Sequence, residues 1–265
     1  MTYVPLTWID LAAAAVLIVF NGALSWALRL GLERSIALAS VRMVVQLGAV
    51  GFVLKFIFEQ TSPLLTAAMA LVMVAVAGHE VLARQETRIG GWMAYGIGTG
   101  TLFFVGLVAT IYSMIVIIGP EPWYAPRYVL PILGMVLGNT LTGVSLVLNT
   151  ITQTAKRERA AIEARLALGE TRFGATSSVV VHGVKTGLMP ILNAMAATGL
   201  VTLPGMMTGQ ILVGMDPVEA AKYQIMIMFV IAASTAFGVM LAAIGGAWLI
   251  TDARHRLRVA ALGLV

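Results

Sequence analysis

Long apolar runs, separated by short polar stretches, dominate the chain. A helix of about 20 residues crosses the hydrocarbon core of a bilayer, so each of these runs is long enough to span one. None shows the period-two alternation of a membrane barrel strand, and all are longer than such a strand. The pattern predicts an all-α polytopic membrane protein with about seven transmembrane helices. The expected spans are residues 5–27, 36–57, 64–83, 92–118, 129–150, 186–213 and 223–250.

Composition agrees with this prediction. Hydrophobic residues make up 59% of the 265 positions and charged residues 11%, whereas soluble domains carry about 25% charged residues. The absence of cysteine excludes disulfides and thiolate sites. No basic residue precedes Arg29 and Asp10 lies near the start, so the first run is predicted to be a retained span rather than a cleaved signal. We expect residues 1–265 to form a single transmembrane permease domain.

The basic residues predict the orientation of the chain. With the N-terminus outside, only Lys55, Arg127 and Lys222 of the 17 basic residues fall on the outer side. Basic residues concentrate on the cytoplasmic side of membrane proteins, so we predict an outer N-terminus and an inner C-terminus. The net charge of +5 then needs no nucleic-acid partner. We expect a multi-pass protein of the bacterial inner membrane, surrounded by membrane lipid.

One predicted cytoplasmic segment, residues 155–185, is much longer than the other connections. Within it, apolar residues recur at helical spacing, and Gly169 followed by Glu170 and Thr171 predicts that the helix stops and restarts. One interpretation is an amphipathic helix lying on the inner membrane surface. The other is a short helix that docks in a groove of a partner protein. The apolar stripe comprises Ala161, Ile162, Ala164, Leu166, Leu168 and Phe173.

The same segment carries a resemblance. Glu163, Ala164 and Gly169 form E-A-x-x-x-x-G, which resembles the loop by which permease subunits of ABC transporters engage their ATPase subunits. The importer version continues to a proline about thirteen residues beyond the glycine, but here the next proline is Pro190. Glu170 also stands where the related L-G-A-T form has alanine.

Further blocks resemble the bacterial FetB family. They are RMVVQL (42–47), LPILGMVLGN (130–139), LPGMMTGQ (203–210) and DPVEAAKYQ (216–224), and the similarity extends over nearly the whole chain. FetB proteins are permeases of an ABC system implicated in iron export, and plant relatives are implicated in aluminium tolerance. The resemblance therefore implies a permease driven by a separate cytoplasmic, FetA-like ATPase.

The chain has no nucleotide site of its own. None of its four lysines lies in a G-x-x-x-x-G-K-[ST] motif, so ATP and magnesium are expected on the partner ATPase, with no cofactor in this chain and no enzymatic activity. One set of spans and one coupling segment predict a homodimer. The resemblance implies that the ATPase-coupling residues are Glu163, Ala164, Leu166, Leu168, Gly169 and Arg172.

The predicted sixth span contains Pro204 and Gly205. Proline lacks a backbone donor and clashes with the preceding turn, so a kink or break is expected. Irregular backbone at membrane depth persists only when it is buried in protein or lines a wet cavity, which makes this region a candidate gate, with a static kink as the alternative. The candidate translocation and gating residues are Pro204, Gly205, Met206, Met207, Thr208, Gln210, Asn139, Arg42 and Gln46.

Some of these polar residues have a second interpretation. Arg42 and Gln46 share a helix face, because they are one turn apart. Arg42 could extend to the inner headgroups, or it could brace an inner gate through Glu80 or another carboxylate. A secondary transporter is the less favoured alternative, since no carboxylate lies at mid-span.

The residues that would bind a metal stay unassigned. Hard ferric or aluminium ions prefer carboxylate oxygens, which are absent from mid-span, and all three histidines lie at the predicted inner side. His79 and Glu80 could form an access site or a solvated pair. Met206 and Met207 suit soft ions but are also ordinary apolar residues. Only the resemblance suggests iron, so another metal complex or a non-metal small molecule stays possible as cargo.

Two other features allow alternative interpretations. G-x-x-x-G pairs occur at 96–100, 134–138 and 205–209, where they could pack helices within one protomer or form part of a dimer seam. The loop between the fourth and fifth spans is rich in proline and aromatic residues. It could be a stiff connection or a lid over a pathway.

Overall fold

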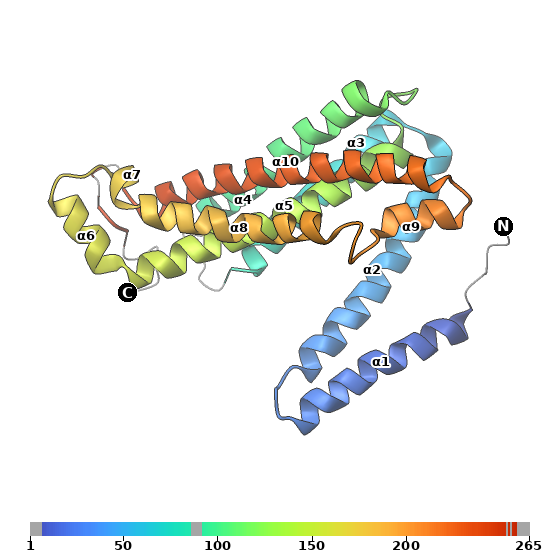
Figure 1. Ribbon diagram of the computed structural model, residues 1–265, viewed down its shortest axis with the longest axis horizontal. Helices are drawn as coiled ribbons and strands as arrows, with labels where there is room; N and C mark the ends of the chain where they lie inside the picture. The colour runs from blue at the N-terminus through green and yellow to red at the C-terminus, as the bar shows by residue number, and fades with distance from the viewer. Residues whose placement is uncertain (1–6, 86–91, 253, 255, 259–265) are drawn as a thin grey trace. The chain divides into compact units, whose positions relative to one another are not determined.

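The computed structural model describes residues 7–85, 92–252, 254 and 256–258 (Figure 1). These residues are almost entirely helical, and seven helices are long and apolar enough to cross a membrane, which confirms the predicted all-α, multi-pass fold. The orientation of the termini stays a prediction. The helices are α1 (Trp8–Ala27), α2 (Glu33–Gln60), α3 (Pro63–Ala83), α4 (Trp92–Tyr112), the π-helix η1 (Ser113–Ile118), α5 (Pro126–Arg157), α6 (Arg159–Ala167), α7 (Arg172–Ala175), α8 (Ser177–Ala197), α9 (Gly205–Leu212) and α10 (Pro217–Ile250).

The chain forms two compact units. The first extends to Ser62 and includes Leu212–Gly214, and the second comprises Pro63–Ile211 and the residues from Met215 onward. In the first, α1 and α2 form a hairpin whose turn is held by Ser25: its Oγ accepts from the backbone N–H of Leu32 at 3.1 Å and donates to Glu33 Oε2 at 3.3 Å. Apart from Ser25 and Ile57, the described side chains of this hairpin are not fully buried.

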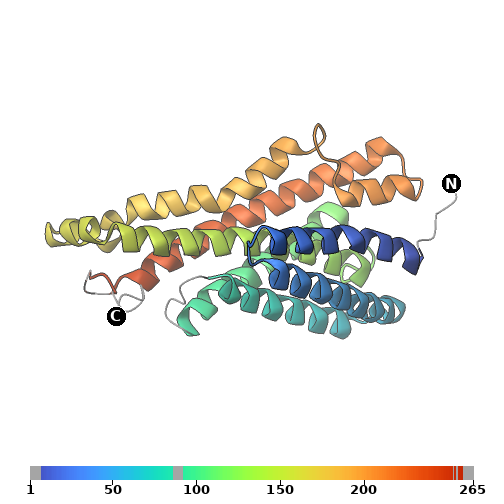
Figure 2. The same cartoon turned by 90° about the horizontal axis from the view of Figure 1, so that it is seen from below.

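The second unit contains the main core. α5 contacts α3, α4, α8 and α10, and α8 also lies along α10 (Figure 2). Buried apolar side chains from α3, α4, α5, α8 and α10 form one cluster with residues of the segment that joins α5 to α8. A second cluster is formed by buried side chains of η1, α5, α8 and α10, with Met114, Ile132, Ile191 and Ile227 among its members.

Glycine allows α8 to approach α5 closely. A Cβ at Gly187 would lie 2.9 Å from the carbonyl oxygen of Gly143, and one at Gly183 would lie 2.7 Å from Ile151 Cγ1. Gly183 and Gly187 themselves form a G-x-x-x-G pair, which supports close helix contact. The G-x-x-x-G pairs noted in the sequence, at 96–100, 134–138 and 205–209, are not packed in this way. Of their six glycines, only Gly134 has a described atom within 4 Å of the position that a Cβ would take.

The sixth span differs from the predicted 186–213. The spanning helix is α8, which starts at Ser177 and ends at Ala197, and α9 is a separate short helix. α8 starts earlier because His182 and Lys185, which suggested a loop, lie on its exposed face while Val179 packs in the core. The predicted break is confirmed, but Pro204 lies beyond the end of the spanning helix rather than inside it.

Candidate functional site

The segment between α5 and α8, residues 158–176, is called the connecting segment below. It is shorter than the predicted 155–185, because α5 continues to Arg157 and α8 begins at Ser177. Inside it, α6 ends at Ala167 and α7 begins at Arg172. Gly169 has a φ of +90°, a conformation that favours glycine, and Thr171 Oγ1 accepts from the backbone N–H of Gly174 at 3.2 Å. The predicted helix stop and restart is therefore present.

The connecting segment is anchored in the core by a few apolar side chains. Ile162, which is only 2% exposed, and Ala175 belong to the main core cluster together with Val179 and Ile250. Leu166 packs against the same cluster. The apolar face of α6 is therefore narrower than the sequence suggested, since Ala161, Ala164 and Leu168 are exposed.

Arg172 provides a second anchor. Its guanidinium carbon lies 3.9 Å from the centre of a Trp248 ring and 5.1 Å from that of Phe173. The two rings also contact each other edge to face, with centroids 6.0 Å apart. A guanidinium over an indole is held by cation–π attraction, so Arg172 ties α7 to α10.

The C-terminal turn supports this end of the bundle. Leu257 packs against the core that holds Ile162 and Ala175. Asp252 fixes the turn, because its Oδ1 accepts from the backbone N–H of Arg256 at 2.8 Å and of Arg254 at 2.9 Å. These bonds, the one from Arg256 first, hold the pKa of Asp252 below its usual range.

The outward face of the connecting segment is different in character. Leu168 is 86% exposed although it is a large apolar side chain, and Gly169 beside it is also exposed. Ala164 is exposed, and the Glu163 carboxylate pairs with Arg159 Nε at 2.8 Å. The predicted coupling residues thus separate into an outward group of Glu163, Ala164, Leu168 and Gly169 and two anchors, Leu166 and Arg172.

The second helix break follows α8. Thr198 is extended and its hydroxyl donates to the carbonyl of Ala194 at 2.7 Å, while Gly199 has a φ of +90°. The turn closes on itself, because the N–H of Gly199 donates to the carbonyl of Thr202 at 2.9 Å. Leu200, at 93% exposed, points away from the described protein. Residues 198–204 are called the α8–α9 turn below.

The gating candidates cluster around α9. The carbonyl of Pro204 accepts from the N–H of Thr208 at 3.0 Å and from its hydroxyl at 3.1 Å, which stabilises the first turn of α9. Met206 packs against the second core cluster. Gln210 Oε1 is buried and has no hydrogen-bond partner among the described atoms. Met207 is half-buried, and Gly205 is exposed.

The remaining candidates lie elsewhere. Asn139 is on the exposed face of α5, where its Nδ2 donates to the carbonyl of Met135 at 2.9 Å. Arg42 and Gln46 are exposed on α2, which belongs to the other compact unit. The structure therefore brings residues 204–210 together at the start of α9, while Arg42 and Gln46 belong to the other unit.

The described residues contain no group of three or more histidine or carboxylate side chains that could hold a metal ion. His79 is exposed, and Glu80 lies 4.0 Å from Arg84 Nε in an i,i+4 ion pair. Met206 and Met207 lie together on α9. No metal ligands are therefore assigned.

The sequence interpretation missed the residues that hold the two breaks in place. Ile162, Ala175 and Trp248 anchor the connecting segment, and Gly183 and Gly187 fit α8 against α5. The glycine pair carried a visible signal, the G-x-x-x-G spacing. This spacing was overlooked because residues up to 185 were assigned to the cytoplasmic connection rather than to a helix.

Comparison with known proteins agrees with this architecture. The family described as "Uncharacterised protein family (UPF0014)" matches residues 8–248. The chain belongs to this family. It is 34% identical to the UPF0014 membrane protein slr1647 of Synechocystis over 238 residues, which is 86% of this chain and 87% of that protein. No solved structure gives a significant match.

Two other relatives carry more specific names. The probable iron export permease protein FetB of Escherichia coli is 31% identical over 257 residues, covering 96% of this chain and 95% of that protein. The protein ALUMINUM SENSITIVE 3 of Arabidopsis thaliana is 35% identical over 217 residues, which is 82% of this chain and 77% of that protein. The resemblance to the FetB family is thus confirmed, and the chain is a multi-pass membrane protein.

Proposed function

We propose that this chain is the permease subunit of an ABC exporter in the inner membrane, powered by a separate cytoplasmic ATPase and working as a homodimer. Its cargo is iron or another metal, free or complexed. The observation that carries the proposal is the connecting segment, which is anchored inward by Ile162 and Arg172 and presents a nearly fully exposed Leu168 outward.

That arrangement suits a mechanical contact. Burying one leucine in a partner groove contributes about 1.5–3 kcal/mol, and the exposed glycine next to it lets the partner approach the backbone. The inward anchors keep the segment from moving independently of α5, α8 and α10. Movement of a docked ATPase would therefore be passed to these helices instead of being absorbed by a loose loop.

The homodimer follows from stoichiometry. The described part of the chain has one connecting segment and one set of spans, while ATP-driven closure of two ATPase subunits needs two contact points. We propose that closure of the ATPases moves the two connecting segments together. α8 then carries the movement to the α8–α9 turn and α9, where the pathway opens to the other side.

A second candidate cargo is a non-metal small molecule. It is favoured by one observation: the described residues hold no cluster of carboxylates or imidazoles that could bind a bare ion. Either cargo leaves the ABC mechanism unchanged. A stand-alone secondary transporter is the alternative mechanism, and it predicts transport without any ATPase.

The test is co-expression with a candidate FetA-like ATPase from the same organism, followed by co-purification and ATP hydrolysis in liposomes with and without iron. The proposal expects a stable complex whose ATP hydrolysis depends on the permease. Leu168→Ala, or Glu163→Arg with Gly169→Trp, should reduce co-purified ATPase about tenfold, which corresponds to about 1.4 kcal/mol.

Leu200→Ala is the matched control. Leu200 is also a nearly fully exposed leucine, but it lies at the other end of α8, so its loss should leave the complex intact. Unchanged association in the Leu168 and Glu163/Gly169 variants would contradict the proposed coupling role. Full transport by the chain alone would instead favour the secondary transporter.

A further inference from the structure

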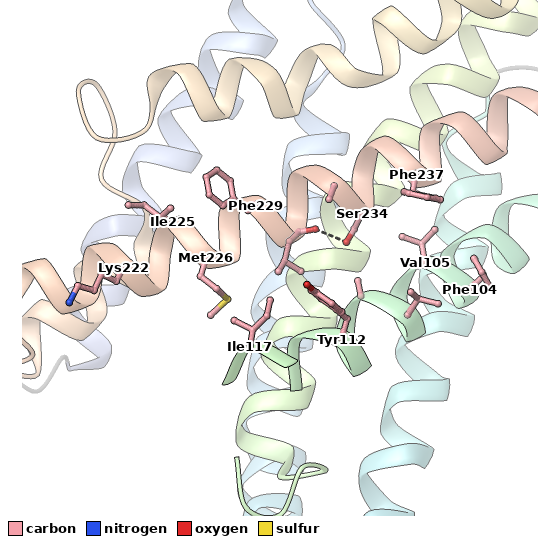
Figure 3. Close-up of a pocket in the computed structure, with 14 residues that line it drawn as sticks. Phe104, Val105, Tyr112, Ile117, Lys222, Ile225, Met226, Phe229, Ser234 and Phe237 are labelled. Atoms are coloured by element: carbon pink, nitrogen blue, oxygen red, sulfur yellow. Dashed lines mark hydrogen bonds between the residues drawn. The ribbon is translucent and has the colours of Figure 1, made fainter. Parts of the chain in front are cut away.

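A long groove runs between α10 on one side and α4 with η1 on the other (Figure 3). Its volume is about 900 Å³, and its walls are apolar and aromatic, with Phe104, Phe229 and Phe237 among the lining residues. Few polar groups line the groove, and they do not provide a polar binding site. The hydroxyl of Ser234 donates to the carbonyl of Val230, and Lys222 lies at one end.

The π-helix shapes the wall opposite α10. Tyr112 and Ile117 both line the groove, and they are five residues apart. In an α-helix, with about 100° per residue, positions five apart would point about 140° away from each other. In a π-helix the i and i+5 residues are joined by the hydrogen-bond pattern and share a face. The change to π geometry at Ser113 therefore places both side chains in the groove.

The length of the groove matches one leaflet of a bilayer. Along α10 it extends from Lys222 to Phe237, which at 1.5 Å per residue is about 22 Å. Half of a hydrocarbon core of about 30 Å is about 15 Å, so an acyl chain fits between the phenylalanines with room for a headgroup at the Lys222 end.

That end carries charges of both signs. Lys222 Nζ donates to Glu219 Oε1 at 2.6 Å, with both side chains more than half exposed. Asp216 lies at the start of the same helix, where its Oδ1 accepts from the N–H groups of Val218 and Glu219. Of these three residues only Lys222 lines the groove, and the Glu219 carboxylate lies beside it through the ion pair. This end of the groove, called the rim below, thus offers one ammonium with a carboxylate next to it, and Asp216 adds a second carboxylate at the start of the helix.

We propose that this groove binds a phospholipid with an ethanolamine headgroup, with one acyl chain in the apolar part. Lys222 faces the lipid phosphate and Glu219 faces its ammonium. A headgroup with only negative charge meets two carboxylates at the rim and is disfavoured. The proposal concerns a lipid of the surrounding bilayer and does not depend on which cargo is moved.

The test uses the full chain, delipidated in detergent and equilibrated with mixed micelles holding equal amounts of phosphatidylethanolamine and phosphatidylglycerol. Native mass spectrometry then counts the retained lipid. We expect phosphatidylethanolamine to be favoured about tenfold. Ala233→Trp, which puts an indole in the groove, should lower its retention about tenfold, while Ile244→Trp, on an exposed part of α10 outside the groove, should not.

Charge reversal provides a second arm. Glu219→Lys should abolish the preference, because the end of the groove then carries two ammonium groups that suit a purely anionic headgroup. Glu219→Lys combined with Lys222→Glu should restore it, because both signs return to the rim. Equal retention of the two lipids by the unmodified chain, or equal loss in Ala233→Trp and Ile244→Trp, would overturn the proposal.

The other possible occupant is a second copy of the chain. Since the sequence has no cysteine, Phe229→Cys and Phe237→Cys are clean single-cysteine variants. We expect no disulfide cross-link between protomers at either position under oxidising conditions in membranes, even within a homodimer. Efficient disulfide-linked dimers at both positions would show that a protomer covers the groove and would overturn lipid binding there.

Discussion

Two helix breaks flank α8, and they are held in opposite ways. The connecting segment is fixed to the core through Ile162 and Ala175 and through Arg172 on Trp248. The α8–α9 turn is closed by backbone hydrogen bonds, one between Gly199 and Thr202 and the others to the last turn of α8, and it exposes Leu200. Segments with more buried contacts are locally more stable. The connecting segment is therefore suited to hold a fixed position, and the α8–α9 turn is suited to change conformation.

The helix between them is rigid enough to connect the two. The close approach of Gly183 and Gly187 to α5 leaves no room for α8 to slide or rotate without loss of packing. A displacement of the connecting segment therefore reaches the far end of α8 with little loss. The proposed mechanism depends on this difference between the connecting segment and the α8–α9 turn. Substitutions at either end of α8 can test it.

The largest expected effect on stability comes from the buried anchor of the connecting segment. Ile162→Ala removes a fully buried side chain and should lower the free energy of unfolding by about 2–5 kcal/mol. Thermal or detergent-induced unfolding of the purified chain measures it. Leu168→Ala, six residues later and exposed, is the control and should stay within about 0.5 kcal/mol. Equal stability of the two variants would contradict the anchoring described here.

The next effect concerns the seam between α5 and α8. Gly187→Ala places a Cβ 2.9 Å from the backbone carbonyl of Gly143 and should destabilise the protein by about 1–3 kcal/mol. Gly138→Ala, in the interior of α5 with no described atom within 4 Å of its Cβ, should be neutral or slightly stabilising. The same unfolding assay compares the two. A harmless Gly187→Ala would mean that the helices are not in close contact.

The stacking of Arg172 on Trp248 should be worth about 0.5–2 kcal/mol, because the indole is half exposed. A double-mutant cycle of Arg172→Ala and Trp248→Leu isolates the pairwise energy. Arg172→Lys should keep part of it. If the two single variants are simply additive, Arg172 does not tie α7 to α10, and a direct role in contacting the partner becomes the better interpretation.

The smallest effects are expected at the α8–α9 turn. Gly199→Ala should cost about 1 kcal/mol, since a φ of +90° strains a residue with a Cβ. Pro204→Ala should stay within about 0.5 kcal/mol, because Pro204 lies outside the spanning helix and the turn is already closed by Gly199 and Thr202. Transport assays on both variants show whether the turn matters for function beyond stability. A large loss of stability in Pro204→Ala would contradict this view.

Hydropathy was sufficient to predict the seven spans, because crossing a membrane demands long apolar helices. Local chemistry was sufficient to predict the stop at Gly169 and the break before α9. The start of α8 was missed, since His182 and Lys185 lie on an exposed helix face that a sequence window cannot distinguish from a loop.

Features that depend on distant residues could not be predicted. Arg172 was assigned to the partner contact, yet its position is fixed by Trp248, far along the chain. The division into two units and the groove beside η1 have no local signature either, because a π turn depends on how the neighbouring helices pack. The roles of the outward residues and of Pro204–Gln210 stay predictions.

The contrast between the two ends of α8 can be measured directly by spin-label distances. In the cysteine-free chain, one pair joins Ala160→Cys on α6 to Val181→Cys on α8, and another joins Val181→Cys to Leu200→Cys. Labelled protomers are diluted with unlabelled ones and assembled with the ATPase, with and without trapped nucleotide. The account predicts that the 160–181 distance stays fixed and narrow while the 181–200 distance shifts or broadens on trapping. A shift in the first distance with an unchanged second would contradict it.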